Sequence, residues 1–109
     1  MAKPGSIGSN FQHVIRQAQK MQKQLADVQE GLEDKEYTGE AAGGMVKAVV
    51  NGRHETIRID VGDDARDEEL DMLLDLIAAA VNDGISKAKA EYESVTAEIT
   101  GGVKIPGFV

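Results

Sequence analysis

Apolar side chains recur at steps of three and four residues through residues 11–32, and this heptad spacing predicts one long helix. The seam consists of Phe11, Val14, Ala18, Met21, Leu25, Val28 and Leu32. We expect the helix to follow a cap at Ser9 or Asn10 and to end near Glu33, a length of about 35 Å. Residues 1–9, which are rich in glycine and serine, are expected to form a mobile arm.

The opposite face of this helix carries basic side chains at the same spacing. The basic stripe consists of His13, Arg16, Lys20 and Lys23. Through residue 26 the chain has no acidic residue, although its net charge is −7. Two interpretations remain open from the residues alone: a solvated outer face, or a surface that neutralises phosphates.

Composition excludes several classes of protein and of site. The 109 residues suit a single domain, 1–109, and the absence of cysteine excludes disulfides, thiol catalysis and cysteine-based metal sites. Neither a membrane-spanning apolar run nor a secretory signal is evident, so we expect a cytoplasmic protein. The two histidines lie on different predicted elements, and no nucleophile or phosphate-loop motif is present. We therefore expect no enzyme, no metal site, no cofactor and no small-molecule substrate.

The middle of the chain predicts antiparallel strands. Strand patterns cover residues 36–40, 45–50 and 53–61, and Asn51-Gly52 predicts a two-residue type I′ hairpin turn. Such a turn places Val46 opposite Ile57. It would bury Val46, Ala48, Ile57 and Ile59 on one face and leave Lys47, His54, Thr56 and Arg58 on the other.

A second long helix is predicted from near Asp67 to the glycines at 101–102. Gly84, in its middle, indicates a close backbone approach or a slight kink. The tail 101–109 cannot be helical through Pro106, and its large apolar residues favour docking. The predicted fold is therefore α+β, with the order α-β-β-β-α and a three-stranded antiparallel sheet.

The apolar seam of residues 11–32 is longer than the sheet that it could cover. Part of it therefore lacks a partner within the chain, and a two-fold homodimer is the common solution. Such a dimer would also double the basic face. The alternative is that the two helices pack on each other within one chain.

Local motifs over nearly the whole chain resemble the YbaB/EbfC nucleoid-associated proteins. They are Arg16-Gln17-Ala18-Gln19-Lys20-Met21-Gln22, Thr38-Gly39-Glu40, Gly43-Gly44, Val46-Lys47, Val49, Asn51-Gly52, Ile59-Asp60, Leu76-Ile77, Ala79-Ala80, Asn82-Asp83, Thr100-Gly101-Gly102 and Ile105-Pro106-Gly107-Phe108. Two positions depart from the family pattern: Gly62 stands where proline is expected, and Gly84 where alanine is expected.

This resemblance implies a tweezer-like dimer of α/β chains with protruding helices. It also implies binding of double-stranded DNA with low sequence specificity, without enzymatic activity, at the nucleoid, with roles in its organisation and in gene regulation. Carried onto this chain, the DNA contacts are Lys3, Arg16, Lys20, Lys23 and Lys104, with Lys87 and Lys89 as weaker candidates.

The rival interpretation is a non-enzymatic interaction module that acts with replication, repair or transcription machinery. The acidic isoelectric point, about 4.7, favours it. Much of the acidity lies in residues 63–98, where eleven acidic residues against three basic ones give a charge of −8. An acidic surface repels phosphates, so the DNA interpretation requires these acids to face away from the basic stripe.

Overall fold

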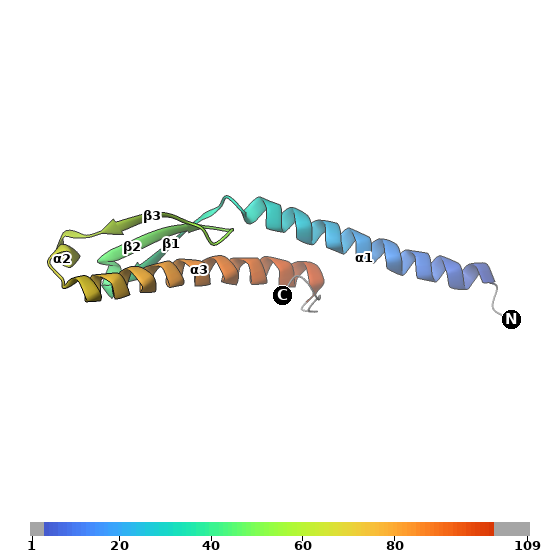
Figure 1. Ribbon diagram of the computed structural model, residues 1–109. Helices are drawn as coiled ribbons and strands as arrows, with labels where there is room; N and C mark the ends of the chain where they lie inside the picture. The colour runs from blue at the N-terminus through green and yellow to red at the C-terminus, as the bar shows by residue number, and fades with distance from the viewer. Residues whose placement is uncertain (1–3, 102–109) are drawn as a thin grey trace.

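The structure, a computed structural model, describes the backbone of residues 4–101 and the side chains of residues 10–101. Its elements, in chain order, are α1 (Pro4–Leu32), β1 (Glu36–Ala41), the short 3₁₀ turn η1 (Ala42–Gly44), β2 (Val46–Asn51), β3 (Thr56–Val61), α2 (Asp63–Arg66) and α3 (Leu70–Thr100). The molecule is elongated, with extents of 80 × 19 × 17 Å (Figure 1). The predicted α-β-β-β-α order is confirmed. Among the described residues, no helix combines the length and the apolar character needed to span a membrane.

The first helix begins earlier than its apolar spacing indicates. α1 starts at Pro4, whose fixed φ suits the first position of a helix, so the cap expected at Ser9 or Asn10 is wrong. The backbone of residues 4–9, assigned to the arm from sequence, is helical. The helix ends at Leu32, close to the expected end at Glu33.

The sheet has the order β1-β2-β3, with antiparallel pairs, and α3 packs along one face of it (Figure 1). The side chains buried between them are Tyr37, Ala41, Val46, Ala48, Val50, Ala80 and Ala88. Most of these side chains are small, so helix and sheet approach closely. The core is therefore thin.

The closest approach joins two glycines. A Cβ atom on Gly39 of β1 would lie 2.0 Å from the carbonyl oxygen of Ala80 and 2.3 Å from the backbone nitrogen of Gly84. A Cβ atom on Gly84 would in turn meet a methyl group of Val50 at 3.1 Å. The backbone approach predicted at Gly84 is confirmed, and Gly39 is the partner that the sequence did not identify.

The connection between β2 and β3 differs from the expected two-residue turn. Asn51 is buried, and its Oδ1 accepts hydrogen bonds from the backbone N–H groups of Arg53 (2.9 Å) and Glu55 (3.0 Å). The loop runs through residues 52–55, with its positive φ (65°) at His54. The type I′ turn is therefore wrong, because the Asn51 side chain closes a longer loop.

The longer loop changes the strand register. Val46 lies opposite Val61, not Ile57, and Ala48 lies opposite Ile59. A bulge near the loop shifts the register again, and the Ile57 side chain remains 50% exposed. The expected burial of Ile57 is therefore wrong, whereas Val46 and Ala48 are buried as predicted.

Side chains of α3 cover the outer edge of β1. The backbone N–H of Glu40 donates to the Asp83 carboxylate at 2.9 Å, and the Lys87 ammonium donates to the carbonyl of Thr38 at 2.8 Å. Asp83 and Lys87 also form an ion pair at 3.1 Å. We call Asp83 and Lys87 the clamp on β1. They form hydrogen bonds with backbone groups that an edge strand otherwise leaves free for another chain.

The second long helix starts at Leu70, after the separate turn α2, and not near Asp67. It ends as predicted at Gly101, which has φ 64° and donates its N–H to the carbonyl of Ala97. Gly102 and the expected docking of the tail lie outside the described residues.

We predict that Gly39→Val lowers the midpoint of thermal unfolding, because any side chain at this position forces β1 away from α3. We expect the free energy of unfolding to fall by about 1–3 kcal/mol, the usual range for overpacking. Circular dichroism during heating measures it. Gly31→Ala, in α1 with open space around its Cβ, is the control and should stabilise by up to about 1 kcal/mol. A Gly39→Val variant as stable as the wild type would contradict the close approach.

We predict that Asp83 supports the fold only while its carboxylate is ionised. The N–H of Glu40, and then Lys87, lower the pKa of Asp83 below its ordinary value of 3.8. Because the pKa is lowered in the folded state, the ionised carboxylate stabilises the fold at pH values above its ordinary pKa. This contribution disappears as the pH falls through the pKa of the folded state. The stability difference between wild type and Asp83→Asn should therefore be full at pH 7 and small in strong acid. Exposed Asp75→Asn is the control, and a pH-independent difference for Asp83→Asn would exclude the charge effect.

Candidate nucleic-acid interface

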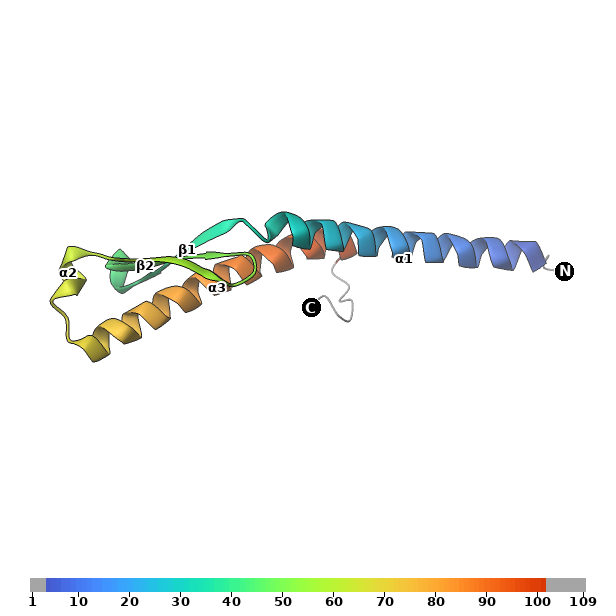
Figure 2. The ribbon, with the colours of Figure 1, turned by 45° about the horizontal axis from the view of Figure 1, so that its top comes forward.

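The N-terminal part of α1 projects beyond the rest of the molecule. In both ribbon views it extends past the end of α3 with no other element beside it (Figures 1 and 2). The side chains of residues 10–20 are all exposed. A surface of this kind is accessible from all sides, so it can approach a partner as large as a DNA duplex.

The C-terminal half of α1 is held against the body of the protein. Leu25 is fully buried, Met21, Val28 and Leu32 are half-buried, and α1 contacts α3 in this region. These residues are the second half of the predicted seam. The seam therefore divides into a packed half and a projecting half.

The loop between β2 and β3 fixes the base of α1. A Cβ atom on Gly52 would lie 1.8 Å from the carbonyl oxygen of Leu32, so the loop backbone touches the end of the helix. Next to it, the Arg53 guanidinium pairs with Glu33 at 3.1 Å and with Asp34 at 3.5 Å. The hydrogen bond that Arg53 donates to the Glu33 carboxylate, followed by the charge of Asp34, raises the pKa of Arg53. A cation at the C-terminal end of a helix is also favourable for the helix dipole.

A second ion pair ties the same junction to α3. Lys35, in the connection from α1 to β1, pairs with Glu91, and this contact lowers the pKa of the Glu91 carboxyl. The Lys35 ammonium also lies over the ring of Tyr37, 5.7 Å from its centre. The direction in which α1 projects is therefore set by packing and by charge at its base.

The basic stripe lies on the face of α1 turned away from the seam. His13, Arg16, Lys20 and Lys23 are all exposed, and Arg16 to Lys23 span about 10 Å along the helix axis. Within residues 10–101, Arg16, Lys20 and Lys23 form no ion pair. By contrast, Lys35, Lys47, Arg53, Arg58, Arg66 and Lys87 all pair with carboxylates.

The remaining predicted DNA contacts have different positions. Lys87 belongs to the clamp on β1, whereas its neighbour Lys89 is exposed on α3. Lys3 and Lys104 lie outside the described residues. The structure therefore brings Arg16, Lys20 and Lys23 together on one face of α1, and Lys87 and Lys89 lie on another element.

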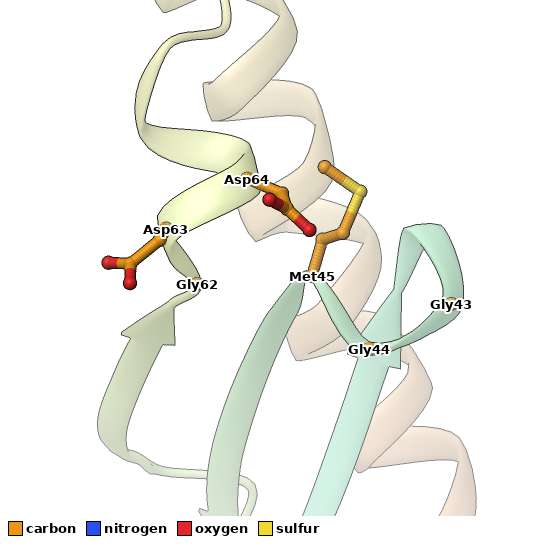
Figure 3. A pocket seen from close by; sticks show the side chains of 6 residues that line it. All are labelled: Gly43, Gly44, Met45, Gly62, Asp63 and Asp64. Atoms are coloured by element: carbon orange, nitrogen blue, oxygen red, sulfur yellow. The ribbon is translucent and has the colours of Figure 1, made fainter.

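The acidic block lies at the opposite end of the molecule. Seven acidic residues and one arginine occupy the segment 63–75, which forms α2 and the start of α3, far from the N-terminal end of α1 (Figure 1). An open pocket of about 410 Å³ lies there, lined by Gly43, Gly44, Met45, Gly62, Asp63 and Asp64. Asp64 lies beside Met45, while Asp63 points away (Figure 3). Without a cationic side chain in its lining, this pocket does not suit a phosphate.

Apolar side chains are also exposed on the projecting half of α1. Phe11 is 66% exposed and Val14 is 63% exposed, and Ile15 lies beside them. Large apolar groups in contact with water on one helix are typical of an interaction surface. The projecting segment therefore presents a basic face and an apolar face.

Comparison with known proteins connects this geometry to one family. Residues 8–103 match the YbaB/EbfC DNA-binding family. A nucleoid-associated protein of Clostridium acetobutylicum is 41% identical over 106 residues, 96% of this chain and 95% of the relative. Another, from Thermoanaerobacter pseudethanolicus, is 44% identical over 110 residues, 99% of both chains. The crystal structure of an uncharacterized protein from Helicobacter pylori matches 72% of this chain and 92% of its own, with a TM-score of 0.56 and 23% identity, a likeness of fold alone.

We predict that the basic stripe contributes nothing to the stability of the fold, because its cations have no partner among the described residues. The double variant Lys20→Gln/Lys23→Gln should change the free energy of unfolding by less than about 0.5 kcal/mol. Chemical denaturation measures this value. Arg53→Gln, which removes the ion pairs at the base of α1, is the comparison and should destabilise the fold more than the stripe variant does. A markedly lower free energy of unfolding in the stripe variant would show that these lysines have a structural role.

Proposed function

The chain belongs to the YbaB/EbfC DNA-binding family, and from this premise we propose that it binds duplex DNA through the basic stripe of α1, as a homodimer. Binding is largely independent of sequence, and it serves the organisation of the nucleoid and the regulation of genes there. The names of the relatives support the nucleoid as the location, since they are nucleoid-associated proteins.

One observation carries the choice of α1. Arg16, Lys20 and Lys23 are exposed cations without ion-pair partners among the described residues, and they share one face of a projecting helix. A paired cation must give up its carboxylate before it can neutralise a phosphate, whereas these three need not. Association with DNA is driven by the release of counterions from the phosphates that such cations neutralise.

The residue types on α1 support low sequence specificity. Contacts to phosphates position a protein on the duplex but carry no sequence information, which comes from the edges of the bases. The aromatic side chains within residues 10–101 are scattered and form no platform for stacking on bases: Phe11 stands alone on α1, Tyr37 is buried in β1 and Tyr92 is half-buried in α3. Contacts by α1 therefore follow the backbone of the duplex.

The distribution of charge supports binding by an acidic protein. The acidic segment 63–75 and the basic stripe occupy opposite ends of the molecule (Figure 1). At physiological ionic strength, charges farther apart than about 8 Å are largely screened in solvent. The acids therefore repel DNA far less at α1 than the net charge of −7 suggests.

Exposed apolar surface supports the homodimer. In the single chain, Phe11 and Val14 on α1 and Leu70 and Leu74 on α3 are each more than half exposed. Association of two copies removes such groups from water, and a two-fold dimer is the commonest arrangement. It also places two basic stripes in one particle, which increases the apparent affinity for a long duplex.

We predict that Lys20→Glu/Lys23→Glu weakens binding to all duplexes alike, by about 10–100-fold at 0.1 M salt, because each lost phosphate contact removes about 0.9 from the slope of log affinity against log salt. Fluorescence anisotropy with unrelated duplexes at several salt concentrations measures both quantities.

The matched control is Lys47→Glu/Arg66→Glu, which makes the same change in net charge outside α1. It should bind within a few-fold of the wild type. Equal losses in both double variants would show that only net charge matters, and an unchanged affinity in the α1 variant would exclude the stripe. Failure of the wild type to bind at low salt would favour the protein-interaction module, whose apolar contacts survive salt.

A further inference from the structure

The cover that α3 gives to α1 stops near Met21. Leu25 is fully buried and Met21 is half-buried, whereas every side chain from residue 10 to residue 20 is exposed. On α3, Tyr92, Val95 and Ile99 are half-buried at helical spacing, up to the last turn of the helix. The packed half of the seam on α1 therefore ends where α3 ends (Figures 1 and 2).

The apolar seam of α1 continues beyond this point without cover. Phe11 is 66% exposed, Val14 is 63% exposed and Ile15 is 39% exposed. Helical spacing places them on the same face as Met21. Removing such groups from water is favourable. The basic stripe lies on the opposite face, so a segment can cover this part of the seam without covering the cations.

The chain leaves α3 at the same place. Gly101 has φ 64°, a left-handed conformation that ends the helix. The next residue is also a glycine, so the backbone can change direction there with little steric restriction. Residues 102–109, which lie outside the described residues, therefore follow the chain from the point at which the uncovered part of the seam begins.

The sequence of residues 102–109 suits an apolar partner. Its large apolar residues are Val103, Ile105, Phe108 and Val109, and the segment contains no acidic residue. In an extended chain Val103 and Ile105 point to one side and Lys104 to the other. Pro106-Gly107 matches the two central positions of a type II turn, which brings Ile105 and Phe108 close together. The segment can therefore present its apolar residues on one side and its single cation on the other.

The length of the segment matches the uncovered part of the seam. Between Met21 and Phe11 the helix rises by about 15 Å. Four residues of extended chain, from Gly101 to Ile105, cover about 13 Å. Ile105 therefore reaches the level of Val14 and Phe11. A segment joined by so short a linker also has an effective concentration in the millimolar range, which favours it over a second copy of the chain as the occupant.

We propose that residues 103–108 dock on the apolar face of the projecting half of α1 in the same chain. The segment runs toward the N-terminus of α1 and packs Ile105 and Phe108 against Phe11 and Val14. It extends the cover that α3 gives to the seam, presents Lys104 to solvent and leaves the basic stripe accessible.

This inference goes beyond the proposed function and leaves another apolar surface for the homodimer. Leu70 and Leu74, near the start of α3, lie at least about 40 Å from Gly101 along the helix. They are each more than half exposed, and they remain available to a second copy.

A fluorescent reporter tests the docking, because the chain has no tryptophan. In the full chain carrying Phe108→Trp, we expect emission at a shorter wavelength than that of tryptophan in water, since the ring packs on apolar groups. Adding Phe11→Gln/Val14→Gln should shift the emission toward the value in water. These side chains are exposed, so the fold should tolerate the change.

The matched control for the reporter is Gln12→Ala/Gln19→Ala, which changes two exposed side chains on other faces of α1. It should leave the emission unchanged. Emission equal to that in water in the Phe108→Trp chain would overturn the docking. The same emission with and without Phe11→Gln/Val14→Gln would also overturn it, because the ring would then pack elsewhere.

Cross-linking identifies the chain that carries the docked segment, because no native cysteine competes. In Val14→Cys/Ile105→Cys we expect a disulfide within one chain on mild oxidation, seen as a monomer that migrates faster on a denaturing gel until it is reduced. In Gln12→Cys/Ile105→Cys the first thiol lies on the opposite face, and oxidation should be much slower.

Two results of the cross-linking would overturn the proposal. A covalent dimer as the main product of Val14→Cys/Ile105→Cys would show that the segment docks on another copy. Equal rates of oxidation in the two variants would show that the segment has no preferred face of α1. Neither measurement uses DNA, so both outcomes are distinct from a failure of the proposed function.

Discussion

The backbones of β1 and α3 meet at Gly39 and Gly84, where no side chain fits between them. This contact draws α3 over β1 and β2 and sets the depth of the small-residue core beneath the helix. It also brings Asp83 and Lys87 to the outer edge of β1, where they close that edge. Because α3 lies mainly over the first two strands, β3 is less covered: Ile59 and Val61 pack only partly against the core, and Ile57 is half exposed.

The same placement of α3 determines how α1 projects. The C-terminal half of α1 packs on α3, and the loop after β2 touches the end of the helix through Gly52. Ion pairs from Arg53 and Lys35 close this junction. Individually, exposed pairs of this kind contribute little to stability, but together with the buried Leu25 they fix the orientation of α1. The cationic half of α1 therefore projects as a rigid arm, at the end of the molecule away from the acidic segment.

Much of this architecture was predictable from the sequence because it depends on periodicity. The heptad of residues 11–32 predicted a long helix, and the strand patterns predicted an antiparallel sheet, since both follow from the repeat of one face. The hairpin was predicted wrongly because Asn51 bonds to its own loop through its side chain, an interaction that competes with the two-residue turn. The start of α1 was missed because residues 4–9 carry no apolar pattern.

The candidate site was predictable only in part. Helical spacing placed Arg16, Lys20 and Lys23 on one face from sequence alone. Whether a basic side chain forms an ion pair depends on which carboxylates the fold places near it. Lys87, also a predicted DNA contact, pairs with Asp83 in the folded chain, whereas these three residues have no such neighbour among the described residues. The roles of Gly39 and Gly52 depend on contacts between segments distant in sequence, to which local patterns give no access.

The central claim is that the projecting part of α1 is the surface that contacts DNA. Chemical labelling of lysines in the wild-type protein, with and without saturating duplex, tests it most directly because each ammonium reports its own accessibility. The account predicts protection of Lys20 and Lys23 that is lost at high salt, with little change at Lys47 on the sheet. Unchanged labelling of the two α1 lysines, with protection confined to other lysines, would contradict it.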